Sequence, residues 1–202
     1  MPEDAGRAVQ GAGEAAEGQK VLLRQFARQV DKALRPVVTG SGVPLVLAAA
    51  EPLASTYRSV NSYPHLAAAT IEGNPEALTD AQLGERARAV LDGIYRDELT
   101  VWRTLFEARA NQGRATTDIA QAARAATVGA VDSMLIDIDE TLHGRIAEDG
   151  AVVFAEQPTA TNYDLVDEIA TRVITTGGRV IAVRKAELPR AAALAAILRY
   201  PV

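Results

Sequence analysis

The spacing of apolar residues predicts alternating helices and strands in the first half of the chain. Apolar side chains recur at helical spacing from residue 19 until Pro36, which predicts an amphipathic helix that ends there. Thr79 and Gln82 have the spacing of a capping box at the start of a later helix. Beyond the first helix, the pattern predicts a strand, a short helix, a strand and a long helix at residues 44–50, 51–60, 65–73 and 79–110.

The polar stretch NQGRATTD at 111–118 separates this half from a second alternating series. An Ala-rich helix capped by Thr116 or Thr117 should come first, and a later helix should begin at a Thr161 cap and stop at Gly177. Strands are predicted at 131–138, 179–185 and 193–200, with a hairpin around Asp149–Gly150. The second half therefore predicts a small α/β/α sandwich.

Three segments follow from these patterns. Residues 1–18 carry almost no large apolar side chains and are expected to be a flexible leader. Residues 19–113 form a partial α/β domain and residues 114–202 the sandwich, so the fold class is α/β. Composition agrees with a globular chain, since 48% of the residues are apolar and 23% are charged.

Composition also limits the expected cellular location and the kinds of catalytic and metal site that the chain can hold. The chain contains no cysteine, which removes disulfides, thiolate nucleophiles and thiolate metal sites. Its first residues lack the layout of a signal peptide, and no apolar run is long enough to cross a membrane. We therefore expect a soluble cytoplasmic protein without a cofactor.

Charge divides unevenly between the halves. Residues 1–115 hold 14 acidic and 13 basic residues, whereas residues 116–202 hold 12 acidic and 8 basic residues, a net charge of −4. An acidic surface does not attract nucleic-acid phosphates, although a local basic stripe still can.

The stretch DIDET at 137–141 matches the D-x-D-x-T nucleophile motif of haloacid-dehalogenase-type phosphatases. That chemistry would use Asp137 and Asp139 with Mg²⁺ and needs a second acidic pair after a later strand. The strand that follows ends instead in Arg184 and Lys185. We interpret the motif as a chance match at the solvated end of a strand and keep a Mg²⁺-dependent phosphatase as an alternative.

The neighbouring residues give the same stretch another meaning. The run DIAQAARAATVGAVDSMLIDID at 118–139 resembles the opening of the third domain of the archaeo-eukaryotic peptide-chain release factors. The helix, glycine and strand unit at 164–183 and the closing LAAILRY at 194–200 are similar to the later parts of that domain. The resemblance implies a domain that docks on a translational GTPase, and the net charge favours a protein partner for it.

The first half is similar to the latter part of the same family's middle domain. EPLASTYRSVNSYPHL at 51–66 resembles its bacterial branch in particular. The peptide-releasing members carry a Gly-Gly-Gln tip, whereas this chain has only Gly18–Gln19, which we interpret as incidental. The chain is expected to be either a fragment of a longer protein or a shortened member.

Two groups of residues are candidates for binding. The resemblance places the first predicted helix beside ribosomal RNA, which makes its basic stripe a candidate phosphate contact; a solvated helix face is the alternative. Loop 61–65 has the composition of a recognition loop, and an ordinary turn is the alternative. The stripe consists of Lys20, Arg24, Arg28, Lys32 and Arg35, and the loop candidates are Asn61, Tyr63, Pro64 and His65.

The remaining polar and aromatic candidates have simpler interpretations. His143 has no evident catalytic partner and is expected in an exposed loop, and Trp102 falls on an apolar stripe. Ribosomal proteins that resemble the second half bind kink-turn RNA through an Asn-Glu pair and a lysine at the start of the first helix. This chain has Thr117–Asp118 and no lysine at that place, so kink-turn binding is not expected. We therefore expect a non-catalytic, translation-linked protein that contacts the ribosome or a translational GTPase, with neither DNA nor a membrane as partner. An orphan protein-interaction module is a further alternative.

Overall fold

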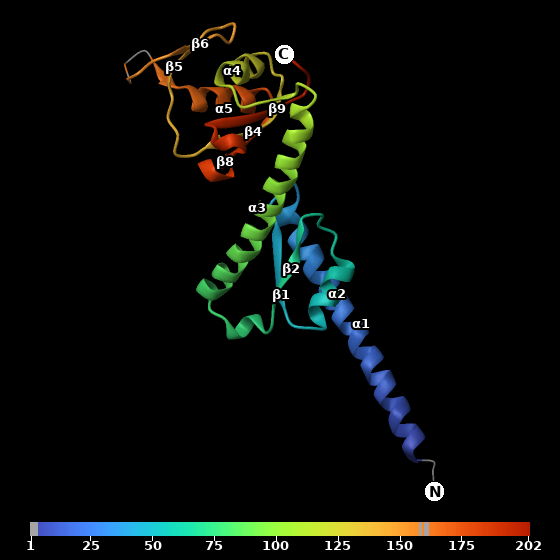
Figure 1. The fold of residues 1–202 in the computed structure, drawn as a ribbon. Helices are drawn as coiled ribbons and strands as arrows, with labels where there is room; N and C mark the ends of the chain where they lie inside the picture. The colour runs from blue at the N-terminus through green and yellow to red at the C-terminus, as the bar shows by residue number, and fades with distance from the viewer. Residues whose placement is uncertain (1–3, 158, 160–161) are drawn as a thin grey trace. The chain divides into compact units, whose positions relative to one another are not determined.

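The computed structural model describes residues 4–157, 159 and 162–202, with side chains from Glu17 onward within those ranges. The chain divides into two compact units, Met1–Arg96 and Asp97–Val202. The boundary falls inside a long helix, α3, whose last turns pack with the second unit. The boundary at 111–118, which follows the end of that helix, stays a prediction. The α/β fold class predicted from the sequence is confirmed: helices and strands alternate in both units (Figure 1).

The first unit is built around one parallel β-α-β crossover. Strand β1 pairs with β2 in parallel, from Leu45 opposite Leu66 to Ala49 opposite Glu72, and α2 connects them. The strand at 44–50, the helix at 51–60 and the strand at 65–73 are thus confirmed. The elements of this unit are α1 (Asp4–Val38), β1 (Leu45–Ala49), α2 (Leu53–Val60), β2 (Leu66–Glu72), a 3₁₀ helix (Pro75–Ala77) and the start of α3 (Asp80–Ala110).

Helix α1 differs from its prediction at both ends. It begins at Asp4, so most of the segment expected to be a flexible leader is helical; residues 1–3 lie outside the described part of the chain. The physical reason is that the segment extends a helix already formed beyond residue 19, because propagating a helix costs far less than nucleating one. Pro36 lies inside the helix rather than ending it. Only Val37 and Val38 follow it, so the proline ring disturbs no more than the final turn.

The capping box of α3 is confirmed. Thr79 N donates to the Gln82 side chain at 2.9 Å, and Gln82 N donates to Thr79 Oγ1 at 3.3 Å. At the other end of the helix, Leu99, Trp102 and Phe106 are buried. Trp102 stacks on Phe106 with ring centroids 5.4 Å apart, so its predicted place on the apolar face is confirmed.

The second unit contains a four-stranded sheet of order β3-β9-β4-β8 and a three-stranded sheet of order β6-β5-β7. In the first sheet, β8 runs parallel to β4 and β9 runs antiparallel to it. The elements after α3 are β3 (Ala115–Thr116), α4 (Ile119–Thr127), β4 (Val131–Asp137), β5 (His143–Ile146), β6 (Val152–Phe154), β7 (Tyr163–Asp164), α5 (Leu165–Thr175), β8 (Arg179–Val183), two 3₁₀ helices (Lys185–Glu187 and Pro189–Ala191) and β9 (Leu194–Leu198).

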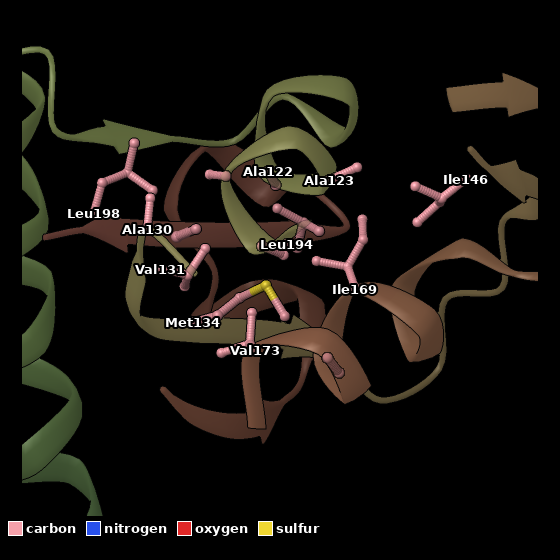
Figure 2. Packing of buried hydrophobic residues seen from close by; sticks show 14 of the residues in the cluster. Ala122, Ala123, Ala130, Val131, Met134, Ile146, Ile169, Val173, Leu194 and Leu198 are labelled. Carbon is pink, nitrogen blue, oxygen red and sulfur yellow. The ribbon is translucent and has the colours of Figure 1, made fainter. Parts of the chain in front are cut away.

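The four-stranded sheet is covered on both faces. Met134 of β4 packs with Leu194 and the helices α4 and α5, as Figure 2 shows. Because strand side chains alternate between faces, Ser133 and Leu135 point to the other side. There Trp102 Nε1 donates to Ser133 Oγ at 3.0 Å, which places the end of α3 on that face. The sandwich predicted for this unit is thus helix, sheet, helix.

The helix starts in this unit differ in detail from the prediction. Asp118, rather than Thr116 or Thr117, caps α4 by accepting from Gln121 N at 2.7 Å. Asp164 caps α5 by accepting from Val166 N at 3.0 Å, and the predicted cap Thr161 lies outside the described residues. Aspartate is as good a cap as threonine, so the sequence offered several neighbouring candidates.

Two predicted turns are confirmed. α5 ends at Thr175 and is followed by Gly177 at φ +75°. In the β5-β6 hairpin, Ala147 N donates to Ala151 O across the Asp149–Gly150 turn. Gly150 has φ +86°, and a Cβ there would lie 2.7 Å from Arg124 Cα, so only glycine fits.

No helix in the described part of the chain is long and apolar enough to span a membrane.

Candidate nucleic-acid interface

One face of α1 presents a row of basic side chains. Lys20, Arg24, Arg28 and Lys32 are all exposed, and none of them forms an ion pair within the described residues. Four residues advance an α-helix by about 6 Å and turn it by about 40°, so the row winds slowly around the helix. Its spacing is comparable with that of successive phosphates along a nucleic-acid strand. We call these four residues the basic row.

The side of α1 next to the basic row packs on the first unit through Ala27 and Asp31, both buried. Asp31 Oδ1 accepts from Ser62 N at 2.8 Å, and its carboxylate also accepts from Ser62 Oγ. Arg35 Nη2 donates to Asp31 Oδ2 at 3.0 Å, and Arg35 Nε donates to Ser62 Oγ at 3.0 Å. These bonds tie loop 61–65 to the C-terminal part of α1.

The hydrogen bond from the Ser62 amide is the main cause of a lowered pKa at Asp31, and it outweighs the opposing effect of burial. Bonds from the side chains of Ser62 and Arg35 act in the same direction. The carboxylate is therefore charged in the folded protein at neutral pH, and its network stays intact.

Loop 61–65 is partly an ordinary turn and partly an open surface. Asn61 Nδ2 donates to Tyr63 O at 2.8 Å, which closes the turn. Tyr63 is buried, and its hydroxyl donates to Val43 O at 2.6 Å. Pro64 and His65 are exposed, and the His65 ring meets the Tyr63 ring edge to face at 5.4 Å. Of the four loop candidates, these last two are the exposed ones.

A groove with a volume of about 600 Å³ joins Arg35 to this loop. Its floor and walls come from the end of α1, the turn that follows and the loop before β2. The structure thus brings Arg35, Pro64 and His65 to one place, and the basic row precedes Arg35 on α1, with Lys32 as its nearest member. The lining residues are Arg35, Val38, Thr39, Gly40, Gly42, Ser62, Tyr63, Pro64 and His65.

Two residues that organise this groove, Asp31 and Ser62, were not predicted as site residues. Asp31 and Arg35 are four residues apart on a helix, and this spacing alone would have indicated an ion pair. Ser62 carries no comparable signal, because its contact with Asp31 joins residues that are distant in sequence.

The acidic end of β4 has its own basic partners. Lys185 Nζ lies 2.8 Å from Glu140 Oε2, and Arg184 Nη1 lies 3.4 Å from Asp139 Oδ2. The hydrogen bond that Lys185 donates to Glu140 raises the pKa of Lys185. Asp137 was expected at the solvated end of a strand, but it is buried. Its carboxylate accepts a hydrogen bond from Asp139 N at 3.1 Å, which satisfies it away from solvent. Across the described residues, no group of three histidine or acidic side chains is arranged to hold a metal ion.

Other candidates have structural contacts. His143 lies half-buried in β5 instead of an exposed loop, because Ala155 N donates to its carbonyl in the ladder. Gly18 and Gln19 are exposed residues within α1. Arg199 Nη1 donates to Gly129 O at 2.9 Å, which fastens the chain after β9 to the end of α4.

The chain is similar to one family of proteins and to several solved structures. Residues 3–97 match the family model for bacterial archaeo-eukaryotic release factor family 11. The resemblance to the bacterial branch of the release factors, read from EPLASTYRSVNSYPHL, is therefore confirmed. That match contains the whole basic row and loop 61–65. No curated protein is similar enough in sequence to count as a relative.

Solved structures share the fold, and two of them match most of this chain. One is archaeal Pelota in a model of ribosome-bound Pelota and ABCE1, with 20% identity and a TM-score of 0.59, covering 88% of this chain and 49% of that one. The other is Dom34 of S. cerevisiae, a translation termination-like factor that interacts with Hbs1, with 15% identity and a TM-score of 0.56, covering 88% and 52%. The chain thus spans about half the length of these proteins.

Proposed function

We propose that this protein is a non-catalytic, translation-linked binding protein that contacts ribosomal RNA through the basic row of α1. The observation that carries the proposal is the row itself: Lys20, Arg24, Arg28 and Lys32 are exposed and unpaired within the described structure. The release-factor family match over the same residues supports a role in translation.

Repulsion between the positive charges of the basic row destabilises the isolated helix. Like charges four residues apart on a helix destabilise it by about 0.2–0.5 kcal/mol per pair, and the row contains three such pairs in succession. Arg35, one turn later, has Asp31 as a partner, whereas the row has none. A polyanion that neutralises the four charges would remove the repulsion and release counterions.

The second unit would contact a protein partner. Its stretch from residue 116 onward carries a net charge of −4, which disfavours phosphate backbones and suits a basic protein surface. The solved structures with this fold include Dom34, described as interacting with Hbs1, and ribosome-bound Pelota. A translational GTPase is the partner that we propose for this unit, in the cytoplasm.

A phosphatase is the competing function, and the contacts at the end of β4 disfavour it. Asp139 and Glu140 face Arg184 and Lys185, at the position where the phosphatase reaction needs further carboxylates. Peptide release is not expected either, because the Gly18–Gln19 pair lies within a helix and the chain has no Gly-Gly-Gln sequence.

Co-sedimentation with ribosomes at low salt tests the proposal. The wild-type chain should pellet with ribosomes, and a variant with alanine at all four positions of the row should stay in the supernatant. A matched control replaces four exposed arginines elsewhere, Arg86, Arg88, Arg145 and Arg184, and should pellet like the wild type. If the wild type never pellets, or if both variants lose binding equally, the row is only a solvated face and an orphan interaction module becomes the better account.

A further inference from the structure

We propose that the groove between the end of α1 and loop 61–65 takes one unpaired nucleotide of an RNA strand whose backbone follows the basic row. This inference rests on the proposed function and adds to it the structural class of RNA that the protein would select. Three features of the groove support it: its size, its ring platform and a guanidinium held at its edge.

The groove has the capacity for one nucleotide. Its volume of about 600 Å³ falls within the range of about 300–1,000 Å³ usual for small-molecule sites. A base with its sugar fits such a space, whereas a base pair inside a duplex could not enter. Gly40 and Gly42 in its wall have positive φ angles, and a Cβ at either would meet no atom within 4 Å, so the backbone there is open to approach.

The ring platform consists of the Tyr63 and His65 side chains, and it is held rigidly. The Tyr63 hydroxyl donates to Val43 O at 2.6 Å and lies 3.2 Å from Ser41 Oγ, which fixes the tyrosine ring. The His65 ring packs edge to face on that tyrosine, and Leu45 N donates to the His65 carbonyl at 2.9 Å, which ties the residue to β1. An exposed ring held in this way is a surface on which an unpaired base can stack.

The guanidinium of Arg35 completes the site. Its Nε and Nη2 atoms bond to Asp31 and Ser62, which hold the group in place, while 61% of the side chain remains exposed. Among the hydrogen bonds of the described residues, none involves Nη1, so that edge can donate to a sugar or phosphate oxygen. Asp31 offsets part of the positive charge, so Arg35 orients the nucleotide and the neighbouring Lys32 supplies the attraction.

Selection of an unpaired base can be measured with two RNA hairpins that differ by one nucleotide. One hairpin carries a single bulged 2-aminopurine, and the other is fully paired. The 202-residue chain should bind the bulged hairpin about tenfold more tightly. This ratio corresponds to the lower part of the range of about 1–3 kcal/mol for stacking one base on an aromatic ring. The fluorescence of 2-aminopurine should also change on binding.

Variants separate this site from the basic row. His65→Ala should bring the ratio of the two affinities to about one, and His65→Phe should restore the preference because it keeps a flat ring. Lys20→Ala should weaken binding of both hairpins and leave their ratio unchanged. Equal affinity of the wild type for both hairpins, or an unchanged ratio in His65→Ala, would overturn the inference and leave the ribosome contact standing. Failure to bind either hairpin, together with failure to pellet with ribosomes, would overturn both.

Discussion

Replacing Asp31 with alanine should loosen loop 61–65 from α1. Asp31 is 5% exposed, and its carboxylate accepts hydrogen bonds from the Ser62 amide, the Ser62 hydroxyl and Arg35. Removing the acceptor deletes these bonds, and hydrogen bonds to a charged group contribute about 1.5–3 kcal/mol. We take about 2 kcal/mol as the expected loss, an increase of about 30-fold in the opening equilibrium constant, since 1.36 kcal/mol corresponds to a factor of ten.

Native-state hydrogen exchange measures this loss locally, which suits a chain with two units. The Ser62 amide should lose its protection in Asp31→Ala, and the Leu45 amide, bonded to His65 O at 2.9 Å, should exchange about 30-fold faster. Gln25→Ala, on an exposed turn of the same helix, is the control and should change neither rate. Unchanged exchange at both amides in Asp31→Ala would refute the role of the carboxylate.

The same network predicts a pH dependence. The pKa of Asp31 is lowered in the folded protein below its ordinary value of 3.8, chiefly by the Ser62 amide. The stabilisation from Asp31 is therefore fully present above pH 3.8 and is lost as the pH falls below that value through the folded-state pKa. The stability difference between the wild type and Asp31→Asn should be constant from pH 7 to about 5 and shrink below 3.8. A difference that grows as the pH falls would contradict this sign.

Three further predictions concern the remaining candidates. Trp102→Phe keeps the contact with Phe106 but loses the bond to Ser133 Oγ, so it should destabilise the second unit by about 1 kcal/mol in urea unfolding followed by far-ultraviolet circular dichroism; no loss would show that the bond is neutral. An aryl phosphate with Mg²⁺ should not be hydrolysed above the buffer rate, and a clear rate that Asp137→Asn abolishes would restore the phosphatase alternative. Ribosomes loaded with labelled peptidyl-tRNA should release no peptide, whereas release that Gln19→Ala abolishes would show that the Gly18–Gln19 pair is functional.

Local signals in the sequence predicted most of the elements. The Thr79–Gln82 capping box and the helix stop at Gly177 depend on residues close in sequence, and both were found where they were predicted. The predicted end of α1 was wrong, because a proline in the last turn disturbs only the final residues of the helix. Asp137 was expected in solvent. Its burial depends on a hydrogen bond from the backbone amide of Asp139, which the spacing of apolar residues does not predict.

The groove could be predicted only in pieces. The basic residues and the recognition-like loop were each visible as local patterns, but nothing in their spacing says that Arg35 and His65 line the same groove. That proximity comes from pairing β1 with β2, which brings the start of β2 beside the end of α1. Long-range contacts of this kind follow from the fold and not from the local sequence.

The salt dependence of ribosome binding tests the central claim most directly. Each phosphate contact contributes about 0.7–0.9 to the slope of log K against log salt concentration. If Lys20, Arg24, Arg28 and Lys32 each contact a phosphate, the fourfold alanine variant should bind with a slope shallower than that of the wild type by about 3. The control that replaces Arg86, Arg88, Arg145 and Arg184 should keep the wild-type slope. Identical slopes for the wild type and the fourfold variant would contradict the account, because the basic row would then make no contact with RNA.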